Sequence, residues 1–176
     1  MSMELKKGLY RPDIYVALGS NLGDCRSEIR LAFDFLKSLE PRGWSESSIW
    51  ISSPVGCPPG SGDFHNAVAG LYLDMELSAM ELLLRLQDYE RQRGRISPAV
   101  PNSPRTIDLD ILYFRNECRN DPELTLPHPR AVLRRFVMEP LAEIAPDLKL
   151  EAGMAPARIV AARLRKEAPE QRMERL

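Results

Sequence analysis

The stretch that decides the fold is Pro104-Arg105-Thr106-Ile107-Asp108-Leu109-Asp110-Ile111-Leu112-Tyr113-Phe114. From Thr106 onward it is rich in β-branched, aromatic and apolar residues, which predicts a strand that begins just after a proline. Alternate side chains of a strand lie on the same face, so Asp108 and Asp110 are expected to point the same way. The residues expected on the opposite face are Ile107, Leu109, Ile111 and Tyr113.

Two carboxylates side by side on one strand call for a cation. Unpaired, they would repel each other and raise each other's pKa, and Arg105 alone is a modest partner. Mg²⁺, or a pair of Mg²⁺ ions, fits better, because it binds carboxylate oxygens and takes its remaining ligands from water and substrate phosphates. The alternative is a solvated strand face with its polar residues outward. The Asp-x-Asp pattern alone supports the two interpretations about equally.

Length, charge and cysteine content limit the class of protein. The 176 residues suit a single domain, expected over residues 14–176 after a polar leader at residues 1–13. The net charge of −1 argues against strong non-specific nucleic-acid binding, and no apolar run approaches the length of a membrane span. The three scattered cysteines indicate free thiols in a reducing compartment rather than a zinc site. We therefore expect a cytoplasmic protein that binds neither nucleic acid nor membranes.

Hydrophobic periodicity and helix caps divide the chain into elements. The expected strands cover residues 14–18, 48–53, 64–73 and 106–114. The expected helices begin at Asp24 or Ser27 and stop at Pro41 or Gly43, begin at Ser78 and stop at Gly94, and begin at His128-Pro129, with Pro140 ending or kinking the third. A charged tail at residues 155–175 is expected to be helical at least to Arg165, with a structural role only.

The order strand, helix, strand, strand, helix, strand predicts an α+β fold. It is the order of the ferredoxin-like βαββαβ sandwich, an antiparallel sheet with two helices on one face, here followed by extra C-terminal helices. Two proline-rich or glycine-rich segments, residues 53–63 and 96–103, are candidate loops over a site. The glycine-rich residues 19–24 lack the lysine of a phosphate-binding loop, so we interpret them as a turn into a helix.

Two further groups of residues suggest a ligand site. Phe64 and Asn66 share a strand face, where a ring and an amide could read a flat heterocycle, although an edge aromatic and a turn asparagine explain them equally simply. His65 points away from them and is expected at the surface. Carboxylates and arginines that converge on one place describe a polyphosphate site, in which positioning and electrostatics do most of the work. The residues of this second group are Asp108, Asp110, Arg95, Arg105, Glu90, Arg134, Arg135 and His128.

Several motifs together resemble one family. They are Gly19-Ser20-Asn21-Leu22-Gly23-Asp24, Ser53-Pro54-Val55-Gly56, Phe64-His65-Asn66-Ala67-Val68, Gly94-Arg95, residues 104–112, Leu126-Pro127-His128-Pro129-Arg130 and residues 139–146. Their order and spacing resemble those of the 6-hydroxymethyl-7,8-dihydropterin pyrophosphokinases of folate biosynthesis. The resemblance covers residues 14–165, and several motifs in register are far more specific than any one of them.

The resemblance implies transfer of pyrophosphate from ATP to the hydroxymethyl group of a reduced pterin, giving AMP. The implied ligands of two Mg²⁺ ions are Asp108 and Asp110, and the implied catalytic residues are Arg95, Arg105, Asp108 and Asp110. The implied pterin contacts are Ser52, Ser53, Val55, Phe64, Asn66 and Phe136. The implied ATP contacts are Gln87, Glu90, Arg95, Arg105, Ile111, Thr125, His128 and Arg134. Residues 55–63 and 96–103 resemble the loops that close over both substrates, and the expected oligomeric state is a monomer.

One departure from the family pattern leaves an alternative open. Many members carry a second arginine two residues after Gly94-Arg95, where this chain has Ser97, and Arg91, Arg93 and Arg135 are candidates to substitute for it. The main alternative is therefore a degenerate homologue that binds pterin or nucleotide with little turnover. A third possibility is a ferredoxin-like regulatory or protein-interaction domain, which would leave the convergent carboxylates and arginines without a purpose.

Overall fold

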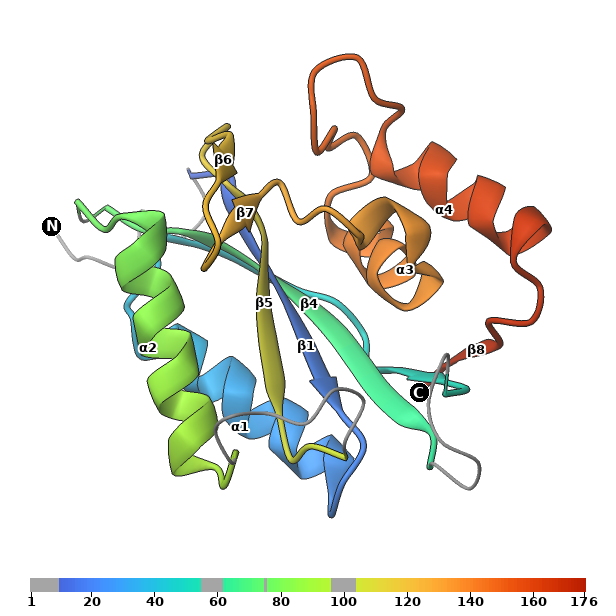
Figure 1. The fold of residues 1–176 in the computed structure, drawn as a ribbon, viewed down its shortest axis with the longest axis horizontal. Helices are drawn as coiled ribbons and strands as arrows, with labels where there is room; N and C mark the ends of the chain where they lie inside the picture. Colours follow the sequence, from blue (N-terminus) through green and yellow to red (C-terminus); the bar gives the residue numbers. More distant parts are fainter. Residues whose placement is uncertain (1–9, 55–61, 75, 96–103) are drawn as a thin grey trace, which may run out of the picture.

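The computed structural model describes residues 10–54, 62–74, 76–95 and 104–176. Its centre is a six-stranded sheet in the order β5-β1-β4-β3-β8, with β2 also paired to β4 and every pairing antiparallel (Figure 1). The strands are β1 (Ile14–Ser20), β2 (Gly43–Glu46), β3 (Trp50–Ser52), β4 (Phe64–Tyr72), β5 (Asp108–Phe114) and β8 (Met173–Arg175). A separate hairpin joins β6 (Arg119–Asn120) to β7 (Thr125–Leu126).

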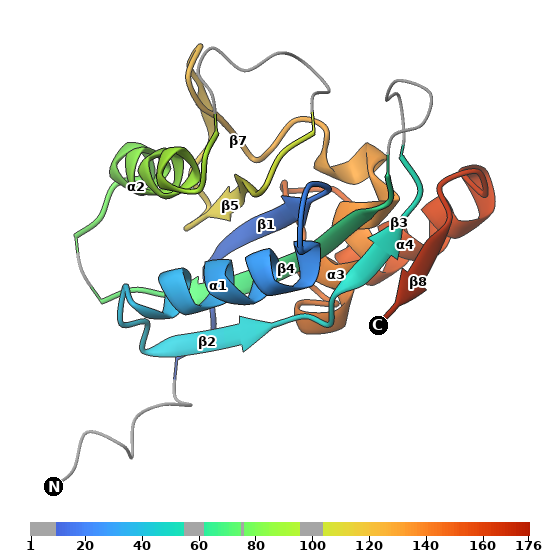
Figure 2. The same cartoon turned by 90° about the horizontal axis from the view of Figure 1, so that it is seen from below.

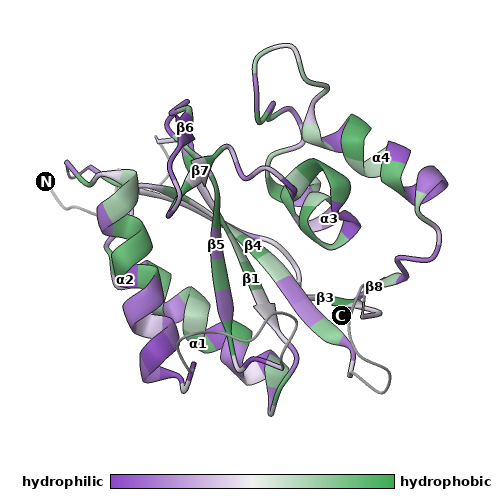
Figure 3. Ribbon diagram, in the orientation of Figure 1, coloured by the Kyte–Doolittle hydropathy of each residue, from purple (hydrophilic) through white to green (hydrophobic). Residues whose placement is uncertain are grey.

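The sheet carries helices on both faces. On one face, α1 (Cys25–Lys37) and α2 (Ala79–Gln92) pack on alternate residues of the strands, and on the other lie α3 (Arg135–Ile144) and α4 (Ala157–Glu167) (Figure 2). Figure 3 shows hydrophobic residues along the central strands, whereas the C-terminal half of α2 is hydrophilic. The α+β class is thus confirmed, and the C-terminal helices cover the second face. No helix among the described residues has the length and apolarity needed to cross a bilayer.

The predicted caps of the first two helices are present. The Asp24 carboxylate accepts a hydrogen bond from the Ser27 backbone at 3.2 Å and opens α1, so of the two candidates Asp24 is the cap. Ser78 and Glu81 form the reciprocal capping box of α2. Beyond that helix Gly94 has a φ of +93°, a conformation that favours glycine and ends the helix as predicted.

The prediction of a single strand over residues 48–53 is wrong in its extent. Two short strands, β2 and β3, pair with successive parts of β4, and Gly43, expected as a helix stop, begins β2. Between them Ser47 keeps the ladder together, since its backbone donates to Val68 O at 3.0 Å and its hydroxyl accepts from Val68 N at 2.9 Å. A side chain therefore replaces a backbone partner at the break, which hydrophobic alternation does not reveal.

The predicted face of Tyr113 is wrong, because β5 contains a β-bulge. Tyr15 pairs with Tyr113 and Val16 with Ile111, so Leu112 is an extra residue in β5. Consequently Tyr113 packs with the α3 and α4 side of the sheet, whereas Ile111 stays on the α1 and α2 side. The residues before the bulge, including Asp108 and Asp110, keep the predicted alternation.

The third helix begins later than predicted and runs through its proline. After His128 the chain forms only a 3-10 turn, η2 (Ala131–Leu133), and Arg134 is extended before α3 starts at Arg135. Pro140 is buried inside α3, which continues to Ile144, so the expectation that it could end the helix is wrong. Burial of the apolar face outweighs the one hydrogen bond that proline removes.

We predict that Glu139→Gln destabilises the fold in a pH-dependent way. Glu139 is 3 % exposed, and its carboxylate accepts hydrogen bonds from Arg135 Nε at 3.0 Å and from Arg165 Nε at 2.7 Å. Burial alone would raise the pKa of Glu139, but the hydrogen bonds from Arg165 and Arg135 outweigh it and bring the pKa below its ordinary value of 4.5. A carboxylate whose pKa is lowered by folding stabilises the protein above its unfolded-state pKa and loses that effect as pH falls through its folded-state pKa.

The variant should therefore lose about 2 kcal/mol of unfolding free energy at neutral pH, and the difference should narrow at about pH 3. Urea unfolding at the two pH values measures it. Glu167→Gln is the matched control, because Glu167 is an exposed partner of Arg163 at 3.5 Å. Equal losses at both pH values would show that the ion pairs are not the cause.

Candidate active site

A cavity of about 150 Å³ lies where β1, β4 and β5 meet the N-terminal end of α3. Strand register explains why it forms there. Gly19 pairs with Asn66 on one side and with Asp108 on the other, so a residue without a side chain separates the two polar groups. The cavity is lined by Ala17, Leu18, Gly19, Asn21, Ser52, Ser53, Phe64, Asn66, Arg105, Asp108, Asp110, Arg134, Phe136 and Val137.

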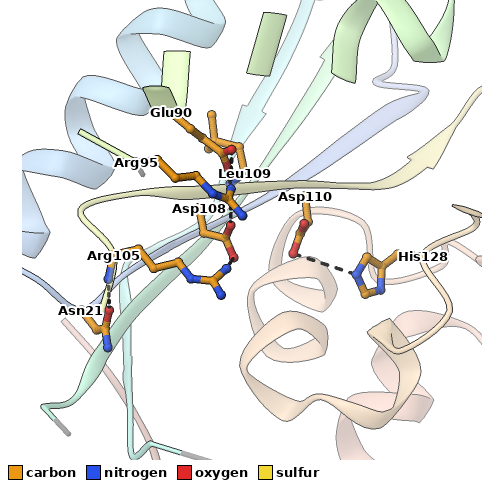
Figure 4. Close-up of polar contacts among 8 residues, drawn as sticks. All are labelled: Asn21, Glu90, Arg95, Arg105, Asp108, Leu109, Asp110 and His128. Carbon is orange, nitrogen blue, oxygen red and sulfur yellow. Dashed lines mark hydrogen bonds and ion pairs between the residues drawn. The ribbon is translucent and has the colours of Figure 1, made fainter. Parts of the chain in front are cut away.

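Asp108 lies between two arginines at one end of the cavity. Arg95 Nη1 donates to Asp108 Oδ1 at 2.9 Å, and Arg105 Nη1 donates to Asp108 Oδ2 at 2.7 Å (Figure 4). Asn21 holds the backbone of Arg105 in place, since its Oδ1 accepts from Arg105 N at 2.8 Å. Each oxygen of the carboxylate thus has its own guanidinium partner, and of these two arginines Arg105 lines the cavity while Arg95 lies outside its lining.

Glu90 supports this cluster from α2, on the α1 and α2 face of the sheet. Its side chain is 2 % exposed, accepts a hydrogen bond from Leu109 N at 2.7 Å and forms an ion pair with Arg95 (Figure 4). Burial raises the pKa of Glu90 and the charge of Asp108 adds to this, although the Leu109 N–H and Arg95 favour the charged form. The contacts make Glu90 a link between the end of α2 and the strand that carries both aspartates.

Asp110 is the less neutralised of the two aspartates. Burial, reinforced by the charge of Asp108, raises its pKa to about 6. The side chain is nevertheless 45 % exposed, so water and ions reach it from the cavity. Among the described residues, the basic side chain within 4 Å of its carboxylate is that of His128, whose Nε2 lies 3.9 Å from Asp110 Oδ2 (Figure 4).

His128 is neutral at physiological pH. Burial, together with the charges of Arg134 and Arg130, lowers its pKa to about 4. Nδ1 accepts a hydrogen bond from Arg130 N at 3.2 Å, which leaves the proton of the neutral ring on Nε2, toward Asp110. The pair is therefore a neutral ring beside a carboxylate rather than an ion pair.

The other end of the cavity is aromatic and amide-lined, as strand alternation predicted for Phe64 and Asn66. Asn66 is 4 % exposed and its Nδ2 donates to Ser52 Oγ at 2.9 Å. The Arg134 guanidinium lies 5.5 Å from the ring centre of Phe136, at the start of α3. Rings, an amide and hydroxyls thus converge on one small space beside the carboxylates.

Several predicted contacts lie outside the cavity lining. Gln87 is half-buried on α2, one turn before Glu90, and Thr125 is on β7. The Ile111 side chain is 3 % exposed in the core on the α1 and α2 side. Val55 and Ser97 fall outside the described residues, as do most of the two candidate loops.

The arginines proposed to replace the missing loop arginine have other partners. Arg91 pairs with Asp88 at 3.2 Å, Arg93 bonds Glu28 at 3.0 Å through its Nε, and Arg135 pairs with Glu139. None of these three lines the cavity. The expectation that one of them takes over the role is not supported by their contacts.

Sequence reasoning missed five lining residues. Ala17, Leu18, Gly19 and Asn21 come from β1 and the following turn, and Val137 from α3. Asn21 stood within a recognised motif and could have been found there, because a turn asparagine often bonds neighbouring backbone. The apolar residues carry no such signal, since only the strand register places them beside the polar ones.

The two aspartates suit an ion that arrives with a ligand rather than a preformed metal cage. Within the described part of the chain, no cluster of three or more His, Cys, Asp or Glu side chains could hold a metal. Mg²⁺ is commonly held by one or two carboxylates, with water and substrate phosphates completing its octahedron. Asp108 and Asp110 line the same cavity and fit that donor set.

Comparison with known proteins bears on the family. The model of the 7,8-dihydro-6-hydroxymethylpterin-pyrophosphokinase (HPPK) family matches residues 15–146. A 2-amino-4-hydroxy-6-hydroxymethyldihydropteridine pyrophosphokinase of Pseudomonas aeruginosa is 43% identical over 141 residues, which cover 80% of this chain and 85% of the relative. A protein of the same name from Haemophilus influenzae is 39% identical over 137 residues, covering 77% and 83% of the two chains.

A solved structure agrees in fold. Plasmodium falciparum HPPK-DHPS, wild type with pterin and p-hydroxybenzoate, has a TM-score of 0.63 at 13% identity and matches 94% of this chain but only 46% of its own length. This chain spans less than half of that longer one, and the likeness concerns the fold alone. The family match and the relatives, which extend over most of the sequence, show that this chain belongs to the HPPK family of pterin pyrophosphokinases.

Proposed function

We propose that the cavity is where this chain transfers pyrophosphate from ATP to the hydroxymethyl group of 6-hydroxymethyl-7,8-dihydropterin, a step of folate biosynthesis. Membership of the HPPK family supports the reaction. The observation that carries the placement is the division of one cavity into a carboxylate and arginine end and an aromatic and amide end. A flat polar heterocycle and a polyphosphate are the two ligands that such ends suit.

At the aromatic end, we assign the pterin ring to the space between Phe64 and Phe136. Rings on both sides supply stacking, and the Asn66 amide beside Ser52 and Ser53 supplies hydrogen bonds to the polar edge of the heterocycle. Val55 belongs to the same proposed set. The hydroxymethyl group would then point toward Asp108 and Asp110.

At the charged end, we assign the triphosphate of ATP to Arg95, Arg105 and Arg134. Asp108 and Asp110 would hold two Mg²⁺ ions, which when bound neutralise the phosphate oxygens. Gln87, Glu90, Ile111, Thr125 and His128 are the remaining proposed nucleotide contacts. Glu90 acts from below the sheet, because its bonds to Arg95 and Leu109 hold the phosphate-binding groups.

For this reaction the chain must position two substrates and stabilise the negative charge on the transferred phosphoryl group. The pterin hydroxyl loses its proton to solvent as its oxygen bonds to the β-phosphorus, and the bond from that phosphorus to the oxygen shared with the α-phosphorus breaks, so that AMP leaves with that oxygen. Arg105 donates from the cavity wall and can stabilise the charge that develops on the phosphoryl oxygens. No covalent intermediate with a side chain is required.

We further propose a ferredoxin-like βαββαβ core, a single domain over residues 14–176, a monomeric state and a cytoplasmic location. The strand order β5-β1-β4-β3 supports the ferredoxin-like assignment, with β2 and β3 together acting as its second strand. Residues 10–13, placed in the polar leader, partly pack on the domain, since Asp13 N donates to Leu71 O at 3.0 Å.

The test is AMP release from ATP and Mg²⁺, with and without 6-hydroxymethyl-7,8-dihydropterin and with an excess of chelator. AMP that requires both pterin and Mg²⁺ supports the proposal. Binding of both substrates without AMP would instead indicate the degenerate homologue, in which Ser97 has replaced a needed arginine. If the protein bound neither ATP nor the pterin, both the proposed function and the degenerate-homologue alternative would be contradicted.

We predict that Asn66→Ala weakens pterin use selectively. The substitution removes a buried amide from the cavity and leaves Ser52 Oγ without its donor. The KM for pterin should rise roughly 10- to 100-fold, because a site built around hydrogen bonds loses affinity when one partner is missing. Steady-state kinetics at saturating ATP measure this, and the KM for ATP serves as the internal control. Equal increases in both KM values would contradict the assignment.

A further inference from the structure

The C-terminal segment, residues 170–175, contacts β3 and Ser53, which form the strand wall of the cavity. β8 pairs with β3, so that Met173 lies opposite Ser52. Just before β8, the backbone of Ser53 donates to Arg172 O at 3.2 Å, and the Ser53 hydroxyl donates to Glu170 O at 3.4 Å. Ser52 and Ser53 both line the cavity, so this wall is attached to the C-terminal segment on its outer side.

The same segment also contacts the start of α3, which forms the helical wall of the cavity. Gln171 Oε1 accepts from Arg135 N at 2.9 Å, and Gln171 O accepts from Arg135 Nη1 at 2.9 Å. Arg135 is the first residue of α3 and lies between Arg134 and Phe136, which both line the cavity. The first N–H groups of a helix have no partner within it, and Arg134 offers no side-chain cap, so Gln171 provides one from a distant part of the chain.

Arg135 therefore connects the two walls rather than entering the cavity. Its Nε donates to the buried carboxylate of Glu139 at 3.0 Å, so the guanidinium is held on both sides. The contacts of Ser53 and Arg135 come from three consecutive residues of the C-terminal segment, 170–172. These residues lie beyond the stretch matched by the family model, which ends at residue 146.

We propose that Gln171 is a positioning residue for the pterin end of the cavity. Its side chain caps the start of α3, while the backbone of its neighbours, residues 170 and 172, holds Ser53, so Gln171 keeps Phe136 at the separation from the serines that a flat ring requires. The inference rests on the proposed function, because it takes a pterin as the occupant. Gln171 itself does not line the cavity, so its side chain acts through the backbone of Arg135 at the start of α3.

Gln171→Ala should change pterin use and leave nucleotide use nearly intact. Asp108, Arg95 and Arg105 are held by contacts with α2, β5 and the turn after β1, not by the C-terminal segment. Loss of one partly buried hydrogen bond predicts a pterin KM that is roughly three- to tenfold higher, with kcat and the KM for ATP changed by less than about twofold. Pterin-dependent AMP release measures all three.

Two further variants separate positioning from general damage. Gln171→Glu keeps an oxygen that can accept from Arg135 N, so it should restore the pterin KM. Glu174→Ala alters an exposed residue of the same segment outside the cavity lining, and it should behave as wild type. An unchanged pterin KM in Gln171→Ala, a parallel change in both KM values, or no restoration by Gln171→Glu would overturn the proposal.

Amide exchange of Arg135 distinguishes this inference from the proposed function. The Arg135 N–H should exchange faster in Gln171→Ala than in wild type, whether or not the enzyme turns over. Unchanged exchange would overturn the role of Gln171 even if the wild type makes AMP from pterin. Absence of pterin-dependent AMP in the wild type would instead contradict the proposed function, and the positioning role with it.

Discussion

Asp110→Asn is expected to lower kcat/KM by about 10³-fold, because one of the two carboxylates that face the proposed polyphosphate site loses its charge. The side chain keeps its shape, and 45 % of the aspartate is exposed to the cavity, so packing is little affected. Burial and the charge of Asp108 raise the pKa of Asp110 to about 6, which means that ionised Asp110 destabilises the fold at neutral pH. The variant should therefore melt at the same or a higher temperature.

Pterin-dependent AMP release and thermal melting together measure this prediction. Asp147→Asn is the matched control, since Asp147 is an exposed carboxylate whose partner is Arg158 at 2.9 Å. Loss of activity with a lower melting temperature would attribute the effect to unfolding. Full activity in Asp110→Asn would remove the aspartate from the proposed metal site.

Arg105→Lys is expected to lower kcat by about 10²-fold, with KM values changed much less. Lysine keeps the positive charge but loses the planar fork that reaches Asp108 Oδ2 at 2.7 Å and faces the cavity. The charge that develops as the phosphorus–oxygen bond breaks is stabilised only by a donor in a fixed position. Loss of that donor should therefore lower kcat rather than raise the KM values.

Arg158→Lys is the matched control for Arg105→Lys. Arg158 is exposed and donates to Asp147 at 2.9 Å, outside the cavity lining. Single-turnover AMP formation separates the chemical step from product release. If Arg105→Lys raised only the KM for ATP, Arg105 would be a binding group rather than one that acts on the developing charge.

Local patterns predicted the elements that depend on neighbours in the sequence. Asp24 caps α1, Ser78 and Glu81 cap α2, and Gly94 ends α2, because a cap needs only residues within one turn. The shared face of Asp108 and Asp110 follows from the pleat in the same way. The elements that were wrong involve distant partners, such as Ser47 bonding Val68 at the break between β2 and β3.

The sequence by itself determined the α+β class, the paired aspartates, the Phe64 and Asn66 face and the likeness to the pterin pyrophosphokinases. Only the tertiary structure placed Gly19 between Asn66 and Asp108, set Glu90 beneath Leu109 and brought Gln171 to the start of α3. The physical reason is that alternation, caps and motifs act within a few residues. Strand register and helix docking instead depend on contacts between residues far apart in the chain, which no local pattern encodes.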